Sequence, residues 1–100
     1  MIYITQLIYL HVGQEAIFDE FEAMAIPLIS QYNGELLLRV RPSPGDTIEA
    51  GIEPPYEIHL VSFDREADFL NFMQDETRKK FLHLKERAIR ISMLFKGEKL

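Results

Sequence analysis

Residues 56–63, with the sequence YEIHLVSF, form the clearest strand pattern in the chain and decide the fold. β-Branched and aromatic residues dominate this stretch. Glu57 and His59 alternate with apolar neighbours, as expected when one face of a strand is apolar and the other is mixed. From Val61 onward both faces are apolar, which is typical of a strand inside a sheet. A helix N-cap follows at Asp64, so we expect a central strand that leads directly into a helix.

The segment before this strand begins with a strand and a helix. Residues 2–11 alternate between a strongly apolar set and a set that carries hydroxyl groups and an imidazole. From residue 17 to residue 32, apolar side chains recur every three or four positions, which predicts an amphipathic helix with Gly13 at its N-cap. Pro27 predicts a kink in this helix. The Asn-Gly pair at 33–34 predicts a left-handed helix end.

A second strand and a long loop separate this helix from the central strand. Residues 35–41 alternate again as a strand. Residues 42–55 are rich in proline, glycine and acidic residues, and a loop of this length is often a lid or a partner contact; a disordered hairpin tip is the alternative. After the central strand, apolar periodicity predicts helices over 64–73 and 78–89, and a last strand follows at 91–95.

Composition excludes several classes of protein. A chain of 100 residues with 47% hydrophobic residues indicates one globular domain, residues 1–100. The net charge of −5 argues against nucleic-acid binding, which requires a basic surface. Cysteine is absent, which excludes disulfides, thiolate catalysis and thiolate metal sites. No apolar run is long enough to cross a membrane, and the first residues lack a signal-peptide pattern, so we expect a cytoplasmic protein.

The order βαββαβ with right-handed crossovers predicts an α+β ferredoxin-like fold: a four-stranded antiparallel sheet with two helices on one face and the first and third strands in the middle. Assigning the apolar side of each strand to the helices places the following residues beneath them: Ile2, Ile4, Ile8, Leu10, Leu36, Leu38, Ile58 and Leu60. The open face would then carry Tyr3, Thr5, Leu7, Tyr9, His11, Leu37, Arg39, His59, Val61 and Phe63.

This open face is too apolar to remain in water. A second copy of the chain, related by a two-fold axis, would cover it most simply. We therefore expect a homodimer that encloses a cavity on the open face of the sheet, with no nucleic acid or membrane as partner.

The whole chain resembles the dimeric α/β-barrel superfamily of the ferredoxin-like class, which includes antibiotic-biosynthesis monooxygenases and muconolactone-isomerase-like proteins. It is most similar to a short family of unknown function. The resemblance is carried by FDREA at 63–67, LKERA at 84–88 and FKG at 95–97. Ser62 stands where that family often has a glutamate, so the resemblance implies no role for a carboxylate at this position. Fold transfers better than function from such short motifs.

His59 is the candidate catalytic residue, since a histidine on a central strand beside a cavity can act as a general base; a structural histidine within the sheet is the alternative. Arg39 could bind a ligand carboxylate or instead pair with Glu57 across the strands. His11 lies at a strand end and is expected at the rim of the cavity. The remaining candidate ligand-binding residues are aromatic or hydroxylated: Tyr3, Thr5, Tyr9 and Phe63.

No metal or cofactor is expected. The three histidines, His11, His59 and His83, lie in different elements without the short spacing of a metal site. A haem-degrading relative would use a helix histidine, and His83 is on a helix. However, the chain has no tryptophan, and Gln6 stands where such relatives tend to have an asparagine.

Two functions from different classes remain open. The first is a non-catalytic homodimer that binds a small apolar or aromatic metabolite, with the 42–55 loop as a partner contact. The second is a cofactor-independent monooxygenase or isomerase of a small aromatic or polyketide-like substrate, with His59 as base and Arg39 or Tyr9 holding an oxyanion. The chain contains no nucleophile-base pair and no phosphate-binding glycine loop, which favours the first.

Overall fold

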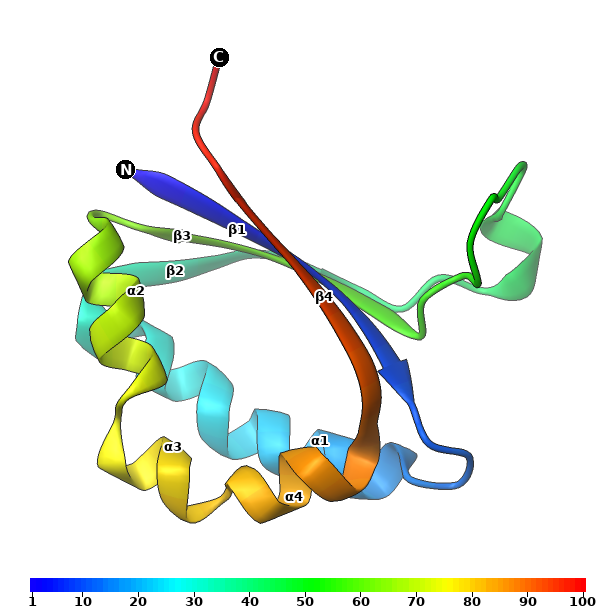
Figure 1. The fold of residues 1–100 in the computed structure, drawn as a ribbon, viewed down its shortest axis with the longest axis horizontal. Helices are drawn as coiled ribbons and strands as arrows, with labels where there is room; N and C mark the ends of the chain where they lie inside the picture. Colours follow the sequence, from blue (N-terminus) through cyan, green and yellow to red (C-terminus); the bar gives the residue numbers. More distant parts are fainter.

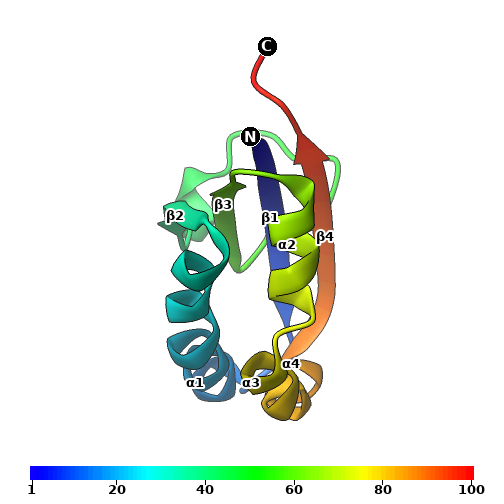
Figure 2. The same ribbon diagram turned by 90° about the vertical axis from the view of Figure 1, so that its left-hand side faces the viewer.

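The computed structural model describes residues 1–100 and shows one four-stranded antiparallel sheet with all the α-helices on one side of it (Figures 1 and 2). The strands are β1 (Ile2–Leu10), β2 (Gly34–Val40), β3 (Glu57–Phe63) and β4 (Ile89–Gly97). Their order in the sheet is β2-β3-β1-β4. The first and third strands are therefore central, and the predicted ferredoxin-like fold is confirmed.

The first helical segment changes character at Pro27. Helix α1 (Glu15–Ala25) continues without a break into the 3₁₀ helix η1 (Ile26–Tyr32), because proline donates no backbone hydrogen bond and fits best near a helix start. The expected kink is thus a change from α to 3₁₀ geometry. Asn33 ends the segment in the left-handed conformation (φ 55°), as predicted.

The second helical segment consists of three short helices: α2 (Glu66–Met73), α3 (Glu76–Lys80) and α4 (Leu82–Ala88). The predicted cap at Asp64 was wrong by one residue, since Arg65 occupies the N-cap and its backbone N–H donates to Asp68. At the start of α3, Asp75 accepts the backbone N–H of Arg78 at 2.7 Å. The predicted break between the two helical pieces is confirmed at residues 74–75.

The side chains of β3 face the opposite way from our assignment. Gln6 of β1 is paired with His59, so His59 and the residues at two-residue spacing from it point towards the helices. Val61 and Phe63 therefore belong to the buried core, while Ile58 lies on the open face with Leu60. The alternation of β3 does not reveal this choice, because both faces of the strand carry apolar residues.

A bulge in β2 reverses the facing of its second half. Leu36 pairs with Val61 on the helix side, but the register shifts before Leu38, which pairs with Leu60 on the open face. Leu38 was therefore wrongly placed beneath the helices, and it is 48% exposed. Arg39, assigned to the open face, lies on the helix side opposite His59.

The apolar core consists of three clusters, one of which joins Phe21 and Ala25 of α1 to Leu84 of α4. A second cluster joins Ile4, Ile29, Val61 and Phe63, and the third joins Ile8, Phe18 and Ala88. Residues of two of these clusters also line the cavity described below: Ile4, Ile29, Val61 and Phe63 from one, and Phe21 and Ala25 from another. No helix of the chain is long and apolar enough to cross a membrane.

The 42–55 loop and the last residues of the chain project away from the helices, on the open side of the sheet (Figure 1). The loop contains the short 3₁₀ helix η2 (Pro44–Asp46). It is attached to the sheet at Glu53, whose carbonyl accepts the hydroxyl of Tyr9 at 2.7 Å and whose carboxylate binds Arg90. Between these projections the sheet exposes the open-face side chains of Leu38, Ile91 and Phe95.

Candidate functional site

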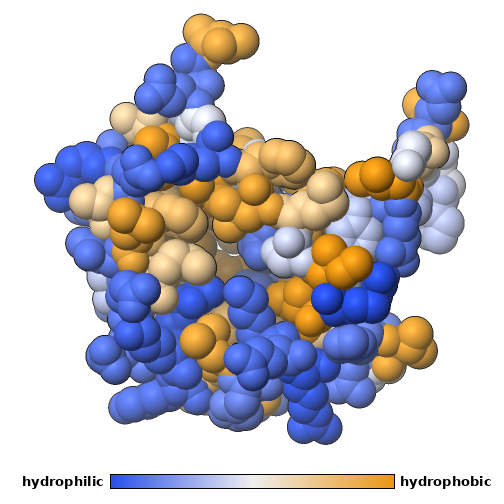
Figure 3. Space-filling model, viewed as in Figure 1, coloured by the Kyte–Doolittle hydropathy of each residue, from blue (hydrophilic) through white to orange (hydrophobic).

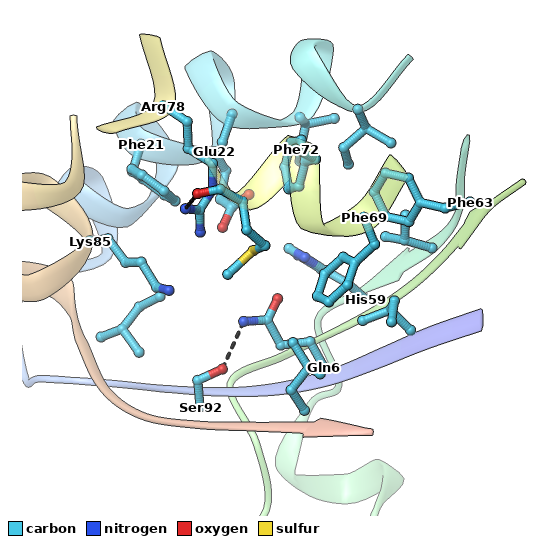
Figure 4. A pocket seen from close by; sticks show the side chains of 18 residues that line it. Gln6, Phe21, Glu22, His59, Phe63, Phe69, Phe72, Arg78, Lys85 and Ser92 are labelled. Atoms are coloured by element: carbon cyan, nitrogen blue, oxygen red, sulfur yellow. Dashed lines mark hydrogen bonds between the residues drawn. The ribbon is translucent and has the colours of Figure 1, made fainter. Parts of the chain in front are cut away.

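A cavity of about 290 Å³ lies between the helix-facing side of the sheet and the helices (Figure 4). Its volume is close to the lower end of the range for small-molecule sites, about 300–1,000 Å³. Figure 3 shows the surface hollowed between β4 and the helices, with hydrophilic residues on the α3–α4 side. The lining is mainly hydrophobic and comprises Ile4, Gln6, Phe21, Glu22, Ala25, Ile26, Ile29, His59, Val61, Phe63, Phe69, Phe72, Met73, Arg78, Lys85, Ile89, Ser92 and Leu94.

Aromatic side chains form one end of the cavity. The ring of Phe63, at the end of β3, lies 5.6 Å from that of Phe69 and 5.7 Å from that of Phe72, both on α2. Such tilted contacts stabilise the group as a unit. This end of the cavity therefore presents a rigid apolar surface to whatever enters it.

Charged side chains from three helices meet at the other end. Figure 4 shows Glu22 of α1, Arg78 of α3 and Lys85 of α4 around the same space. Glu22 and Arg78 are buried, with 7% and 6% of their surface exposed. Burial raises the pKa of Glu22 and lowers the pKa of Lys85, because each charged form loses hydration. None of the three forms an ion pair within the chain, although Glu22 is close enough to Arg78 and Lys85 to interact with both charges.

Two uncharged polar residues complete the floor of the cavity. Gln6 of β1 donates its amide to the hydroxyl of Ser92 on β4 at 2.7 Å. The hydrogen bond fixes the side chain of Gln6 with its carbonyl oxygen towards the cavity (Figure 4). Gln6 can thus accept a hydrogen bond from a ligand.

His59 reaches the cavity from β3 and is held by Glu57. Its Nε2 donates to the carboxylate of Glu57 in a short hydrogen bond. This bond places the proton on Nε2 and leaves Nδ1 as an acceptor. Nδ1 makes no hydrogen bond in the chain and is not enclosed by other atoms, so it is accessible from the cavity. His59 has the geometry of an oriented general base.

Glu57 is fully buried and paired with two arginines of β2 and its following loop. Arg39 Nε lies 2.8 Å from one carboxylate oxygen, and Arg41 Nη2 lies 2.6 Å from the other. Burial alone would raise the pKa of Glu57, but hydrogen bonds from His59 and the two arginines lower it to about 2. Glu57 is therefore ionised at neutral pH and orients His59 without being available to accept a proton.

Of the seven predicted site residues, the structure brings two to the cavity, His59 and Phe63. The cavity within the chain is on the helix side of the sheet. The expected cavity on the open face requires a second copy of the chain and stays a prediction. Arg39 is engaged by Glu57, which is the alternative that the sequence left open. The other four lie away from the cavity: Tyr3, Thr5 and Tyr9 are on the open face and His11 is exposed beyond β1.

The sequence analysis missed the three charged residues of the cavity. Glu22 lies four residues after Phe18 and three before Ala25, inside the apolar stripe of α1. Lys85 is likewise three residues before the buried Ala88. A charged residue within an apolar helical stripe was the available signal, since such positions face the interior. His83, by contrast, is exposed and does not line the cavity, and no group of histidine and acidic side chains is arranged to hold a metal ion.

No protein-family description and no curated protein matches the chain. Solved structures with the same fold do. One is a NIPSNAP family protein of unknown function from Agrobacterium tumefaciens (19% identity, TM-score 0.70, covering 97% of this chain and 86% of that one). Another is a protein of unknown function from Rhodopseudomonas palustris (13%, TM-score 0.81, 99% and 82%). A third is a dimeric protein of unknown function with a ferredoxin-like fold from Bacteroides fragilis (10%, TM-score 0.71, 98% and 95%). These identities establish the fold alone.

Proposed function

We propose that this protein is a homodimer in which each chain binds a small apolar or aromatic metabolite in the cavity between the sheet and the helices. The observation that carries the proposal is the cavity itself, which combines an aromatic end with three charged side chains, Glu22, Arg78 and Lys85, that form no ion pair in the chain. A protein interior normally pairs such groups, and sites for small molecules leave a few of them convergent and unpaired. The open face and the dimeric structural relative support the dimer.

Binding can be tested with a tryptophan introduced at the cavity, since the chain has none. Met73→Trp places the reporter on α2 in the cavity lining. Leu70→Trp, on the same helix but 54% exposed and outside the lining, is the matched control. We expect aromatic acids, phenols and aryl ketones to change the fluorescence of Met73→Trp saturably and to leave that of Leu70→Trp unchanged. If no compound changes the Met73→Trp signal or raises the melting temperature of the wild type, the proposal is wrong.

The hydrogen bond between His59 and Glu57 favours a second candidate function, cofactor-independent catalysis of the kind that the resemblance to monooxygenases and isomerases suggests. Nδ1 of His59 would remove a proton from a carbon next to a carbonyl group. The C–H electron pair would form a double bond to the carbonyl carbon, and the π pair of the carbonyl group would move to its oxygen. Lys85 or Arg78 could stabilise the resulting enolate. Isomerisation returns the proton to another carbon and needs no co-reactant; oxygenation would consume dioxygen at the same carbanion.

Deuterium exchange separates binding from catalysis. Wild-type protein that acts as a base should accelerate the exchange of the α-hydrogens of a bound aryl ketone in D₂O, followed by NMR. His59→Gln should abolish the acceleration while the Met73→Trp reporter still detects the ketone, because glutamine keeps a hydrogen-bonding side chain but is not a base. Unchanged exchange in His59→Gln would exclude His59 as the base.

A further inference from the structure

Arg78 has more hydrogen-bond donors than the chain uses. A guanidinium group carries five N–H donors, and the structure pairs one nitrogen, Nη1, with the carbonyl of Met73 at 3.3 Å. The group lies 5.4 Å from the centre of the Phe72 ring, which holds its plane beside the aromatic end of the cavity. The nitrogen atoms of Arg78 that make no hydrogen bond are not enclosed by other atoms, so these donors face accessible space.

Lys85 adds a second positive charge to the same space. Figure 4 shows its ammonium group directed into the cavity from α4. It makes no hydrogen bond or ion pair within the chain, although part of it is buried. Arg78 is among the charges that lower the pKa of Lys85, which places two like charges close enough to repel each other. An additional anion between the two groups would relieve the part of this repulsion that the nearby Glu22 does not offset.

The carboxylates near this pair offset its positive charge only in part: Glu22 and Asp75 act on Arg78, and Glu22 and Glu86 act on Lys85. Glu57 is committed to Arg39, Arg41 and His59. Glu22 is the one carboxylate that lines the cavity. The lining is therefore positive by one charge when Glu22 is ionised and by two when it is protonated, in a chain whose net charge is −5.

The approach to the cavity is also basic. A shallower depression between the end of α2, α3, α4 and β4 shares Met73, Arg78, Lys85, Ile89 and Ser92 with the cavity. Its lining contains four basic residues against one acidic residue: Arg78, Lys79, Lys85 and Arg90 against Glu86. Arg90 binds Glu53 and Lys79 lies 3.9 Å from Glu76, so Arg78 and Lys85 carry the unpaired charge. A basic mouth on an acidic protein attracts anions selectively.

We propose that the ligand of the cavity is a small apolar or aromatic carboxylic acid, whose carboxylate binds between Arg78 and Lys85 and whose apolar part packs against Phe63, Phe69 and Phe72. This inference rests on the proposed binding function and adds the chemical class of the ligand and its orientation. A carboxylate matches the fork of a guanidinium group and the point charge of an ammonium group. In this orientation the carbon atoms next to the carboxylate lie between the charged end and the aromatic end, beside His59.

Paired probes of equal shape test the charge requirement. Calorimetric titration would compare 3-phenylpropionate with 3-phenylpropionamide, and hexanoate with hexanamide, on wild type, Arg78→Met, Lys85→Met and the control Lys79→Met, which lies in the mouth but outside the cavity lining. We expect wild type and Lys79→Met to bind each acid at least tenfold more tightly than its amide. In Arg78→Met and Lys85→Met the preference should fall below threefold, with the amide affinity unchanged.

The outcomes separate this inference from the function on which it rests. Equal binding of acid and amide to wild type would overturn the carboxylate site and leave the binding function intact. A preference for acid that survives in both variants would also overturn it, because the anion would then bind elsewhere. Absence of binding by every probe would overturn both. If Arg78→Met does not fold by circular dichroism, Lys85→Met alone decides, since its side chain is only partly buried and methionine is close to it in length.

Discussion

Nε2 of His59 donates a hydrogen bond to the carboxylate of Glu57, two residues earlier on β3, and both side chains point towards the helices. A buried carboxylate beside a histidine is usually costly for stability unless it is paired. Here Arg39 and Arg41 supply that pairing from the neighbouring strand and loop. The four residues form one network that connects the edge of the sheet to the cavity.

Glu57→Gln should lower the free energy of unfolding by about 2–3 kcal/mol, because it leaves two arginines without their buried partner. The loss is smaller than for a wholly buried pair, since both arginines retain partial access to water. Urea denaturation at pH 7 measures it. Glu35→Gln, an exposed glutamate on β2 without an ion pair, is the control and should change stability little. A loss below about 0.5 kcal/mol in Glu57→Gln, the size typical of surface substitutions, would show that the network contributes nothing.

The same carboxylate should make stability depend on pH in acid. The pKa of Glu57 is lowered to about 2 in the folded chain, against an ordinary value of 4.5. Its ionised form therefore stabilises the fold fully above pH 4.5, and this contribution is lost as the pH falls from 4.5 through 2. Unfolding free energies measured across this range should decrease more steeply for wild type than for Glu57→Gln. Parallel curves for the two proteins would contradict the lowered pKa.

Glu22 should have the opposite effect on stability. Burial raises its pKa, so the folded chain holds the proton more tightly than the unfolded chain. Stability is then greatest below pH 4.5 and falls as the pH rises through the raised pKa. At pH 8 and without ligand, Glu22→Gln should increase the free energy of unfolding by about 0.5–2 kcal/mol, as removal of a strained functional group often does. Glu20→Gln, exposed on the same helix, is the control, and a destabilised Glu22→Gln would show that the carboxylate serves the fold.

Some features of this structure follow from local sequence patterns, and others depend on contacts between distant segments. The strands β1 and β3, the left-handed end at Asn33 and the order of the elements follow from local patterns of apolar residues and turn residues. The facing of β3 does not, because Ile58 and Val61 are equally suited to the core. Only pairing with Gln6 and Leu7 of β1 decides between them, and pairing is a property of the folded sheet.

The candidate site was harder to predict for the same reason. His59 was identified because it is a titratable residue on a central strand beside the predicted cavity. Arg78 and Lys85 were not identified, since basic residues on a helix usually are exposed. Their burial depends on how the short helices α3 and α4 turn against the sheet, and on the break at residues 74–75, which no helical periodicity specifies.

A substitution at Gly34 tests how tightly the side chains pack beneath β2. A Cβ atom at this position would lie 2.6 Å from the Phe63 ring and 2.7 Å from the side chain of Ile29. Gly34→Ala should therefore lower the free energy of unfolding by about 1–3 kcal/mol through overpacking. Gly45→Ala, with no atom within 4 Å of the added carbon, should change it little. Gly34→Ala combined with Phe63→Leu should cost less than the sum of the two changes, because the smaller side chain makes room for the methyl group; simple additivity would contradict the steric account.

The apolar side chains on the open face of the sheet predict that the protein is a dimer, which its mass in solution would show. Leu7, Leu38 and Phe95 lie on this face, and the latter two are 48% and 53% exposed. A surface of this kind is larger and more apolar than a monomer normally leaves in water, and its two-fold pairing with a second copy would bury it. Light scattering after gel filtration should therefore give twice the 11.7 kDa mass of one chain.

Leu7→Glu should convert this dimer into a folded monomer, because it places a charge in the middle of the face on the central strand β1. Ala23→Glu, an exposed position on α1 on the opposite side of the sheet, should remain dimeric. Circular dichroism of both variants checks that they fold. The cavity lies within one chain, so monomeric Leu7→Glu should still bind the ligand of the Met73→Trp reporter. A wild-type monomer across micromolar to millimolar concentrations would refute the dimer, and the binding proposal would then be judged by the reporter alone.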